Sequence, residues 1–258
     1  MIHKTAIIEE GAVIEDNVEI GAYAYIGSKV TIKQNTKIHH HATIEGKTTI
    51  GEGNEIFPYA SVGTAPQDLK YNGEDTELII GNNNKIREFT LINTGTIQDN
   101  GKTIIGDNNL LMGYVHVAHD CIIGNHCILA NAATLAGHVH LHDGAVIGGM
   151  TPIHQFVHIG AMAMVGGASA VSQDVPPFCM VEGNRAKLRG LNLTGLRRHL
   201  KDRKDIDTIK KAYKELFESG KALKEIASEL VKSENIYVKK LAEFVVNSKR
   251  GIAYDRKM

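Results

Sequence analysis

Residues 2–61 divide into ten consecutive hexads that each begin with isoleucine: IHKTAI, IEEGAV, IEDNVE, IGAYAY, IGSKVT, IKQNTK, IHHHAT, IEGKTT, IGEGNE and IFPYAS. Val62 continues the series, and the same phase returns at Ile80, Ile86 and Ile92. The period then continues one position later at Ile105, Leu111, Val117, Ile123, Leu129, Leu135, Leu141, Ile147, Ile153, Ile159, Val165 and Val171. A period of six is neither the 3.6 of an amphipathic helix nor the 2 of a half-buried strand.

A period of six fits a short strand and a turn, with one large aliphatic side chain pointing inward on each face. Glycine often follows the aliphatic position, as at Gly21, Gly51 and Gly106, and we expect it to turn the corner without steric cost. Three faces make a coil of about eighteen residues, and coils stack at roughly 4.8 Å. The pattern resembles the hexapeptide-repeat family, which implies a left-handed parallel β-helix and a homotrimer.

Interruptions of the repeat predict where loops and helices lie. Residues 64–79 and about 94–104 are polar and out of phase, so we expect them to loop outward, where binding residues tend to lie. After about residue 191 the apolar spacing becomes helical and predicts three short helices. We therefore predict a mainly β domain over 1–190 and a helical domain over 191–258.

Charge and composition restrict the partners. The net charge is zero, which gives no general case for nucleic acid, and no stretch approaches 18 apolar residues, so no integral membrane segment is expected. Residues 196–258 carry 17 Lys and Arg against 10 Asp and Glu, which suits either an acidic partner or a solvated helical surface. The three cysteines lack metal-type spacing, and the start lacks a signal segment, so we expect a reduced cytoplasmic protein.

The histidines in the second register could perform chemistry. His116 and His119 flank the inward Val117, and Gly137 and His138 follow about one coil later. An imidazole could take a proton from an attacking hydroxyl or amine, and an N–H beside glycine could bind the oxyanion of a thioester carbonyl, without a cofactor or metal. Zinc bound by histidines of adjacent coils is the less favoured alternative. Other histidines, such as the run 39–41, fit an incidental surface role.

Six strings follow one another along the chain: Pro66-Gln67-Asp68-Leu69-Lys70-Tyr71, His116-Val117-Ala118-His119-Asp120-Cys121, Ile128-Leu129-Ala130-Asn131, Thr134-Leu135-Ala136-Gly137-His138-Val139, His154-Gln155-Phe156 and Gln173-Asp174-Val175-Pro176-Pro177. Together they resemble the UDP-N-acetylglucosamine acyltransferases that begin lipid A synthesis, and the resemblance runs essentially from end to end. Each string alone is modest, but their order is specific.

The resemblance implies roles at the matching positions. His119 would be the general base, Asp120 its orienting partner and Gly137 the source of the oxyanion N–H. The implied substrate-binding residues are Gln67, Asp68, Lys70, His116, His138, His154, Gln155, Asn192 and Arg198. The acceptor would be a UDP-amino sugar bound between two subunits, and Arg198 suits the nucleotide end because its guanidinium matches phosphate oxygens.

The resemblance also implies a 3-hydroxyacyl donor carried by acyl carrier protein, an acidic partner that would suit the basic helical segment and Arg185, Arg189, Arg197 and Arg198. Met164 and Gly167 match positions of the groove that holds the acyl chain in this family. Gly167 leaves the groove open, so we predict a longer acyl chain, with a fourteen-carbon donor preferred over a ten-carbon one.

Two departures concern the acceptor. Where many family members have His-Arg-Gly-Thr, this chain has Asn93-Thr94-Gly95-Thr96, and Thr194 stands where many have glutamate. Some relatives acylate a 3-amino sugar and form an amide, so both an ester and an amide product stay open.

Three further hypotheses compete. The later N-acyltransferase of the same pathway usually has a globular domain before the repeat, whereas here the hexads begin at Ile2. A short-chain acetyl-CoA transferase would lack the interruption at 64–79 and the helical tail. A non-catalytic β-helix scaffold would need the hexads but not the grouping of His116, His119, Gly137 and His138.

Overall fold

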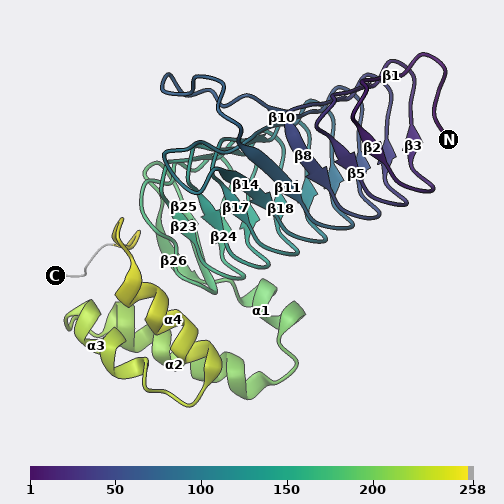
Figure 1. The fold of residues 1–258 in the computed structure, drawn as a ribbon. Helices are drawn as coiled ribbons and strands as arrows, with labels where there is room; N and C mark the ends of the chain where they lie inside the picture. Colours follow the sequence, from purple (N-terminus) through teal and green to yellow (C-terminus); the bar gives the residue numbers. More distant parts are fainter. Residues whose placement is uncertain (255–258) are drawn as a thin grey trace.

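The computed structural model describes residues 1–254 and shows a three-sided prism followed by a helical region (Figure 1). Sheet 1 contains β1 (Ile7–Ile8), β4 (Tyr25–Ile26), β7 (Thr43–Ile44), β10 (Ser61–Thr64), β13 (Leu91–Asn93), β16 (His116–Val117), β19 (Thr134–Leu135) and β22 (Pro152–Ile153). Sheet 2 contains β2 (Val13–Ile14), β5 (Thr31–Ile32), β8 (Lys47–Ile50), β11 (Glu77–Ile80), β14 (Lys102–Ile105), β17 (Ile122–Ile123), β20 (His140–Leu141) and β23 (His158–Ile159).

Sheet 3 closes the prism. It contains β3 (Glu19–Ile20), β6 (Lys37–Ile38), β9 (Glu55–Ile56), β12 (Lys85–Ile86), β15 (Leu110–Leu111), β18 (Ile128–Leu129), β21 (Val146–Ile147), β24 (Met164–Val165), β25 (Cys179–Glu182) and β26 (Lys187–Leu191). Each strand pairs in parallel with its equivalent in the next coil, and the last pair, β25 with β26, is antiparallel. The sequence did not predict this antiparallel pair, because the hexads fade after Val171.

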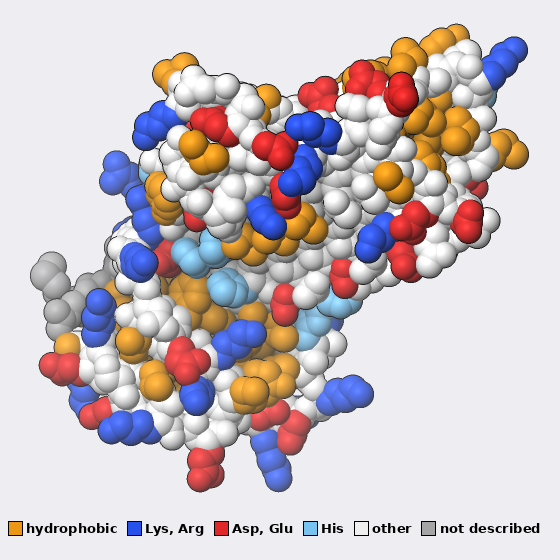
Figure 2. Space-filling view, in the orientation of Figure 1, with side chains coloured by type: hydrophobic (Ala, Val, Ile, Leu, Met, Phe, Trp, Pro, Cys, Tyr) orange, Lys and Arg blue, Asp and Glu red, His pale blue; other side chains and the backbone are white. Residues whose placement is uncertain are grey.

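The predicted aliphatic ladder forms the core. From Ile20 to Val171 every inward hexad position is at most 2% exposed. Ile2, in the first coil, is 51% exposed because only one side of that coil is covered by another coil. Figure 2 shows apolar side chains gathered at this N-terminal end of the prism. The β-helix predicted from the hexads is thus confirmed.

The glycines at the corners have a different role from the predicted one. A positive φ occurs at the third corner residue, for example Tyr23 (58°) and Asn35 (60°). Among the described glycines that follow an aliphatic hexad position, only Gly63 (83°) has a positive φ. A Cβ on Gly21 would lie 2.5 Å from the His40 nitrogen, and one on Gly106 would lie 2.7 Å from the Gly124 oxygen. Glycine is therefore needed here for the close approach of the next coil and not for turning the chain.

Both predicted interruptions leave the prism between sheet 1 and sheet 2. The first excursion, residues 65–76, joins β10 to β11, and the second excursion, residues 94–101, joins β13 to β14. The first projects well beyond the coils near β10 in Figure 1. Both are shorter than the sequence indicated, because β11 begins at Glu77 and β14 at Lys102, and these four-residue strands pair along their whole length.

The helical region contains four helices within residues 1–254, where the sequence predicted three. Helices α2 (Arg203–Glu218), α3 (Leu223–Leu230) and α4 (Ile236–Asn247) account for the predicted apolar pattern. The additional α1 (Leu193–His199) is too short to show a period and buries only Leu196. Residues 255–258, the last four of the predicted helical domain, lie outside the described residues. Among residues 1–254, none of the helices has the length and apolar content that a bilayer crossing requires.

Candidate active site

The histidines singled out from the sequence gather on one edge of the prism, between sheets 1 and 2. His119 and Asp120 lie in the turn between β16 and β17, and Gly137 and His138 lie in the equivalent turn of the next coil, between β19 and β20. The His138 N–H donates to the His119 carbonyl oxygen at 3.1 Å. Coil stacking therefore places residues that are eighteen or nineteen positions apart side by side.

Asp120 is the buried anchor of this site, with no exposed surface. Its Oδ1 accepts from the Thr96 backbone N–H at 2.9 Å, and its Oδ2 accepts from the Thr96 hydroxyl at 2.6 Å. Its own N–H donates to the Thr103 hydroxyl at 2.9 Å. Burial alone would raise the pKa of Asp120, but the hydrogen bonds from His119 and Thr96 outweigh burial and hold this pKa below its usual value.

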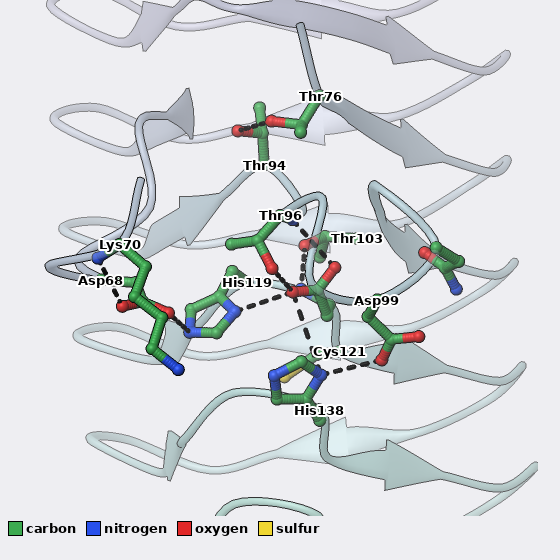
Figure 3. A network of polar contacts seen from close by, with 12 residues as sticks. Asp68, Lys70, Thr76, Thr94, Thr96, Asp99, Thr103, His119, Cys121 and His138 are labelled. Carbon is green, nitrogen blue, oxygen red and sulfur yellow. Dashed lines mark hydrogen bonds and ion pairs between the residues drawn. The ribbon is translucent and has the colours of Figure 1, made fainter. Parts of the chain in front are cut away.

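Asp120 orients the His119 ring. His119 Nδ1 lies 2.8 Å from Asp120 Oδ2, and an ionised carboxylate only accepts hydrogen bonds, so Nδ1 carries the proton and Nε2 keeps its lone pair. His119 Nε2 lies 4.0 Å from Asp68 Oδ2, which belongs to the first excursion (Figure 3). A hydroxyl oxygen placed between these two atoms could form a hydrogen bond with both.

The first excursion holds Asp68 through its own backbone. The Lys70 N–H donates to Asp68 Oδ1 at 2.9 Å, which fixes the local turn and leaves Asp68 Oδ2 facing His119. The side chains of Gln67 and Lys70 are exposed beside it. A chain segment more than forty residues before His119 thus supplies the second wall of the site.

Gly137 lies against the face of His119. A Cβ on Gly137 would lie 2.6 Å from His119 Cε1 and 2.7 Å from His119 Nε2, so any side chain there would displace the ring. Within residues 1–254 the Gly137 N–H has no hydrogen-bond partner. Because the Gly137 N–H takes no part in the hydrogen bonds between coils, it is free to donate beside the ring that would act as the base.

The neighbouring histidines have different surroundings. His138 Nδ1 lies 2.8 Å from Asp99 Oδ2, and the His138 ring stacks on Phe156 with centroids 4.4 Å apart. His116, on β16, is half-buried, and desolvation lowers its pKa from the ordinary value. His154 Nδ1 accepts from the Arg250 guanidinium at 3.1 Å, and Gln155 follows it on the same edge.

Three residues of this network were missed by the sequence analysis: Thr96, Asp99 and Thr103. Thr96 and Asp99 belong to the second excursion, and Thr103 lies in β14 at its base. The excursion has no period that would place its side chains. The only available signal was its position one coil before His119 on the same edge.

His119, Asp120 and His138 also form the only group of three or more potential metal ligands in residues 1–254 whose ligand atoms all lie within 4.8 Å. His119 Nδ1 already forms a hydrogen bond with Asp120 Oδ2, and His138 Nδ1 forms one with Asp99 Oδ2. A metal ion would have to replace these hydrogen bonds. The geometry therefore favours proton transfer over metal binding.

Four predicted site residues lie elsewhere in the chain. Met164 lies on the outer face of β24 in sheet 3, and Gly167 is exposed in the turn that follows. Asn192 is the N-cap of α1: its Oδ1 accepts from the Gly195 N–H at 3.0 Å, and its Nδ2 donates to the Met162 carbonyl at 3.0 Å. Arg198 is exposed in the last turn of α1. Within the described residues none of the four contacts His119.

Asn93, one of the two departures from the expected family pattern, is 1% exposed at the end of β13. Its Nδ2 donates to the Thr64 hydroxyl at 2.8 Å and to the Ala65 carbonyl at 3.0 Å. Its side chain therefore anchors the start of the first excursion, the segment that carries Asp68.

Comparisons with known proteins show the family of the chain. Residues 11–46 and 102–137 match the family model described as bacterial transferase hexapeptide (six repeats), and residues 174–253 match that of UDP-N-acetylglucosamine O-acyltransferase, domain 2. The chain is 65% identical over 257 residues, covering 99% of both chains, to the acyl-[acyl-carrier-protein]–UDP-N-acetylglucosamine O-acyltransferase of Aliarcobacter butzleri. The protein of the same name from Sulfurovum sp. is 60% identical, with 99% of this chain and 98% of that protein covered.

Solved structures give the same result. A crystal structure of a UDP-N-acetylglucosamine acyltransferase has a TM-score of 0.96 and 51% identity over all of both chains. The enzyme from Campylobacter jejuni has a TM-score of 0.95 and 49% identity, with 99% of this chain and 100% of that chain covered. On its repeats, its helical region and its end-to-end likeness to these proteins, the chain belongs to the UDP-N-acetylglucosamine O-acyltransferase family of hexapeptide-repeat proteins.

Proposed function

We propose that this protein transfers a 3-hydroxyacyl group from acyl carrier protein to the 3-hydroxyl of UDP-N-acetylglucosamine, the first step of lipid A synthesis. The family membership supports the reaction, because the relatives are named for this acyl donor and this acceptor. The arrangement of His119, Asp120 and Gly137 supplies the chemistry.

His119 acts as the general base. Asp120 holds the ring by Nδ1, and Nε2 takes the proton from the 3-hydroxyl as that oxygen attacks the thioester carbonyl carbon. The negative charge that develops on the carbonyl oxygen is met by the free N–H of Gly137. The C–S bond then breaks, and the leaving thiolate takes the proton back from His119 Nε2. The imidazolium that exists between these steps is stabilised by the carboxylate of Asp120.

The remaining predicted residues bind the two substrates. Asp68 accepts a hydrogen bond from the sugar near its reacting group, and Lys70 contacts the acceptor or its phosphates. His116, His138, His154 and Gln155 line the cleft for the sugar diphosphate. Asn192 and Arg198 would reach this edge from a neighbouring copy in a homotrimer, which would bring the nucleotide-binding end to the site. Asn192 would then serve the nucleotide in addition to capping α1.

The same homotrimer would place Met164 and Gly167 of one copy along the acyl chain bound at the next. Gly167 has no side chain, and a Cβ added there would have the Gly149 oxygen as its nearest neighbour at 3.5 Å, so the groove has room at this point. We therefore propose a long acyl chain. Acyl carrier protein, an acidic partner, would dock on the basic helical segment near Arg197 and Arg198.

The observation that carries the proposal is the His119 ring held between Asp120 and the free Gly137 N–H, with Nε2 facing Asp68. The decisive experiment supplies UDP-N-acetylglucosamine and its 3-amino analogue with hydroxyacyl carrier proteins of several chain lengths and identifies the products by mass. An ester on UDP-N-acetylglucosamine supports the proposal. Exclusive formation of the amide would instead favour the alternative acceptor, through the altered anchoring of the first excursion by Asn93.

A further inference from the structure

We propose that Asp99 is a positioning residue that sets the orientation and tautomer of His138, so that the second excursion controls both imidazole rings of the site. This inference rests on the proposed function, because it gives His138 a role in holding the acceptor. Asp99 stands outside the residues that the family resemblance assigns.

The contact between Asp99 and His138 has the geometry of the pair that orients His119. Asp99 Oδ2 lies 2.8 Å from His138 Nδ1, the same distance that separates Asp120 Oδ2 from His119 Nδ1. Figure 3 shows that both rings receive their carboxylate on the same side and turn Nε2 to the other side, where Asp68 and Lys70 lie. The two imidazole rings therefore lie in successive coils, and each has a carboxylate at 2.8 Å from Nδ1. Asp120 Oδ2 lies farther from His138 Nδ1, at 3.9 Å.

Two neighbouring rings restrict the orientation of the His138 ring. Phe156 stacks on it at an interplanar angle of 8°, and the His119 ring meets it edge-on at 90° with centroids 5.1 Å apart. Stacking fixes the plane of the ring but allows it to flip within that plane. Because an ionised Asp99 only accepts hydrogen bonds, it holds the proton on Nδ1 and leaves Nε2 facing the cleft. In the neutral ring, Nε2 is then an acceptor for a sugar hydroxyl.

The second excursion is built to hold Asp99 in place. The Asp99 and Gly101 N–H groups both donate to the Thr96 carbonyl, at 3.3 and 3.1 Å, and Asn100 Oδ1 accepts from the Lys102 N–H at 2.8 Å. Thr96, at the start of the same turn, binds both oxygens of Asp120. One tight loop therefore positions His119 through Asp120 and His138 directly.

The test combines kinetics with a measurement that does not depend on turnover. Removing a hydrogen bond to a charged group from a binding residue should raise KM for the UDP-sugar about tenfold in Asp99→Ala, with kcat within about threefold of the wild type. In a His138→Ala background the same change should add less than about twofold, because Asp99 acts only through that ring. Asp99→Glu should recover part of the lost affinity.

Nitrogen NMR of 15N-labelled histidine, assigned with His138→Ala, reads the tautomer directly. We expect a protonated Nδ1 on His138 in the wild type and a mixture of tautomers in Asp99→Ala. Asp16→Ala, which removes an exposed carboxylate in the first coils, serves as the matched control and should leave KM and the His138 signals unchanged. Melting temperatures show whether each variant folds, and the isosteric Asp99→Asn replaces Asp99→Ala if the latter melts early.

The proposal is overturned if Asp99→Ala leaves KM and the His138 signals as in the wild type, or if the full rise in KM persists without His138. A wild-type protein that does not acylate UDP-N-acetylglucosamine would contradict the proposed function. The NMR result would still decide the role of Asp99.

Discussion

Along the edge between sheets 3 and 1, exposed rings stack from coil to coil. Tyr59 and Phe89 lie 5.2 Å apart at 6°, and Phe89 and Tyr114 lie 4.9 Å apart at 10°. Along the edge between sheets 1 and 2, the equivalent third corner positions hold Asp120, His138 and Phe156. All six residues have φ between 59° and 63°.

The two edges share a backbone and differ in what covers it. A repeated corner conformation aligns equivalent side chains in columns at the strand spacing, so rings stack without further help. On the edge between sheets 1 and 2, the excursions add carboxylates from outside the column. The repeat alone creates columns of side chains, whereas the carboxylates of Asp68 and Asp99 reach the histidines from departures from the repeat.

Replacing one histidine on each edge should give the largest difference in kcat between the two edges. His119→Ala should lower kcat about 10²- to 10⁴-fold, because it removes the general base. His41→Ala, in the stacked column, should leave kcat within about twofold. Product formation measured by mass, together with melting temperature, checks both variants. A His119→Ala protein that retains wild-type turnover would contradict the mechanism.

Glycine substitutions test the close approach at the site. Gly137→Ala should lower kcat about 100-fold, because its Cβ would lie 2.6 Å from His119 Cε1 and push the base out of position. At Gly167 the nearest atom to a Cβ is 3.5 Å away, so Gly167→Ala should keep kcat. Equal losses in both variants would show that backbone strain, and not the position of His119, is responsible.

Filling the proposed acyl groove should change selectivity instead of chemistry. Gly167→Met should shift the preference from a fourteen-carbon to a ten-carbon donor by about tenfold or more, because each lost methylene contact carries about 1–3 kcal/mol of discrimination. Competition between the two acyl carrier proteins, with product masses as the measurement, gives the ratio. An unchanged ratio would place the acyl chain elsewhere.

Stability should decrease in mild acid through histidines on the outer face of sheet 2. Desolvation and the nearby His158 lower the pKa of His140 to about 4, and desolvation also lowers that of His142. The unfolded chain therefore binds more protons, so stability should be full above about pH 6.5 and decrease as the pH falls towards about 4. Melting curves of His140→Thr should show a shallower pH dependence than those of the exposed control His126→Asn.

Interrupting the ring column should have the smallest effect. Phe89→Ala removes two stacking contacts at a half-exposed position, so we expect a loss of about 1 kcal/mol in unfolding free energy with kcat unchanged. Denaturant unfolding at fixed protein concentration measures the change. Phe89→Leu, which keeps apolar contact but not the ring, should recover part of the loss.

Much of the fold could be predicted because the six-residue period fixes which side chains point inward. Isoleucines such as Ile44 and Ile86 are fully buried where the hexads place them, and the eighteen-residue coil brings Gly137 to His119. The helix α1 could not be predicted, because seven residues do not define a period. The close approach at Gly106 could not be predicted from the sequence either, since it depends on the backbone of the next coil.

The sequence by itself determined the prism, its two registers and the edge on which the histidines lie, because a fixed period translates directly into a fixed direction for each side chain. Only the tertiary structure decided that Asp99 holds His138 and that Thr96 holds Asp120. Thr96 and Asp99 lie in an aperiodic loop, so their distances to Asp120 and His138 follow from how that loop folds back on the coil. A hydrogen bond requires a donor–acceptor distance that is correct within a few tenths of an ångström. The repeat does not fix such distances for a segment that lies outside the repeat.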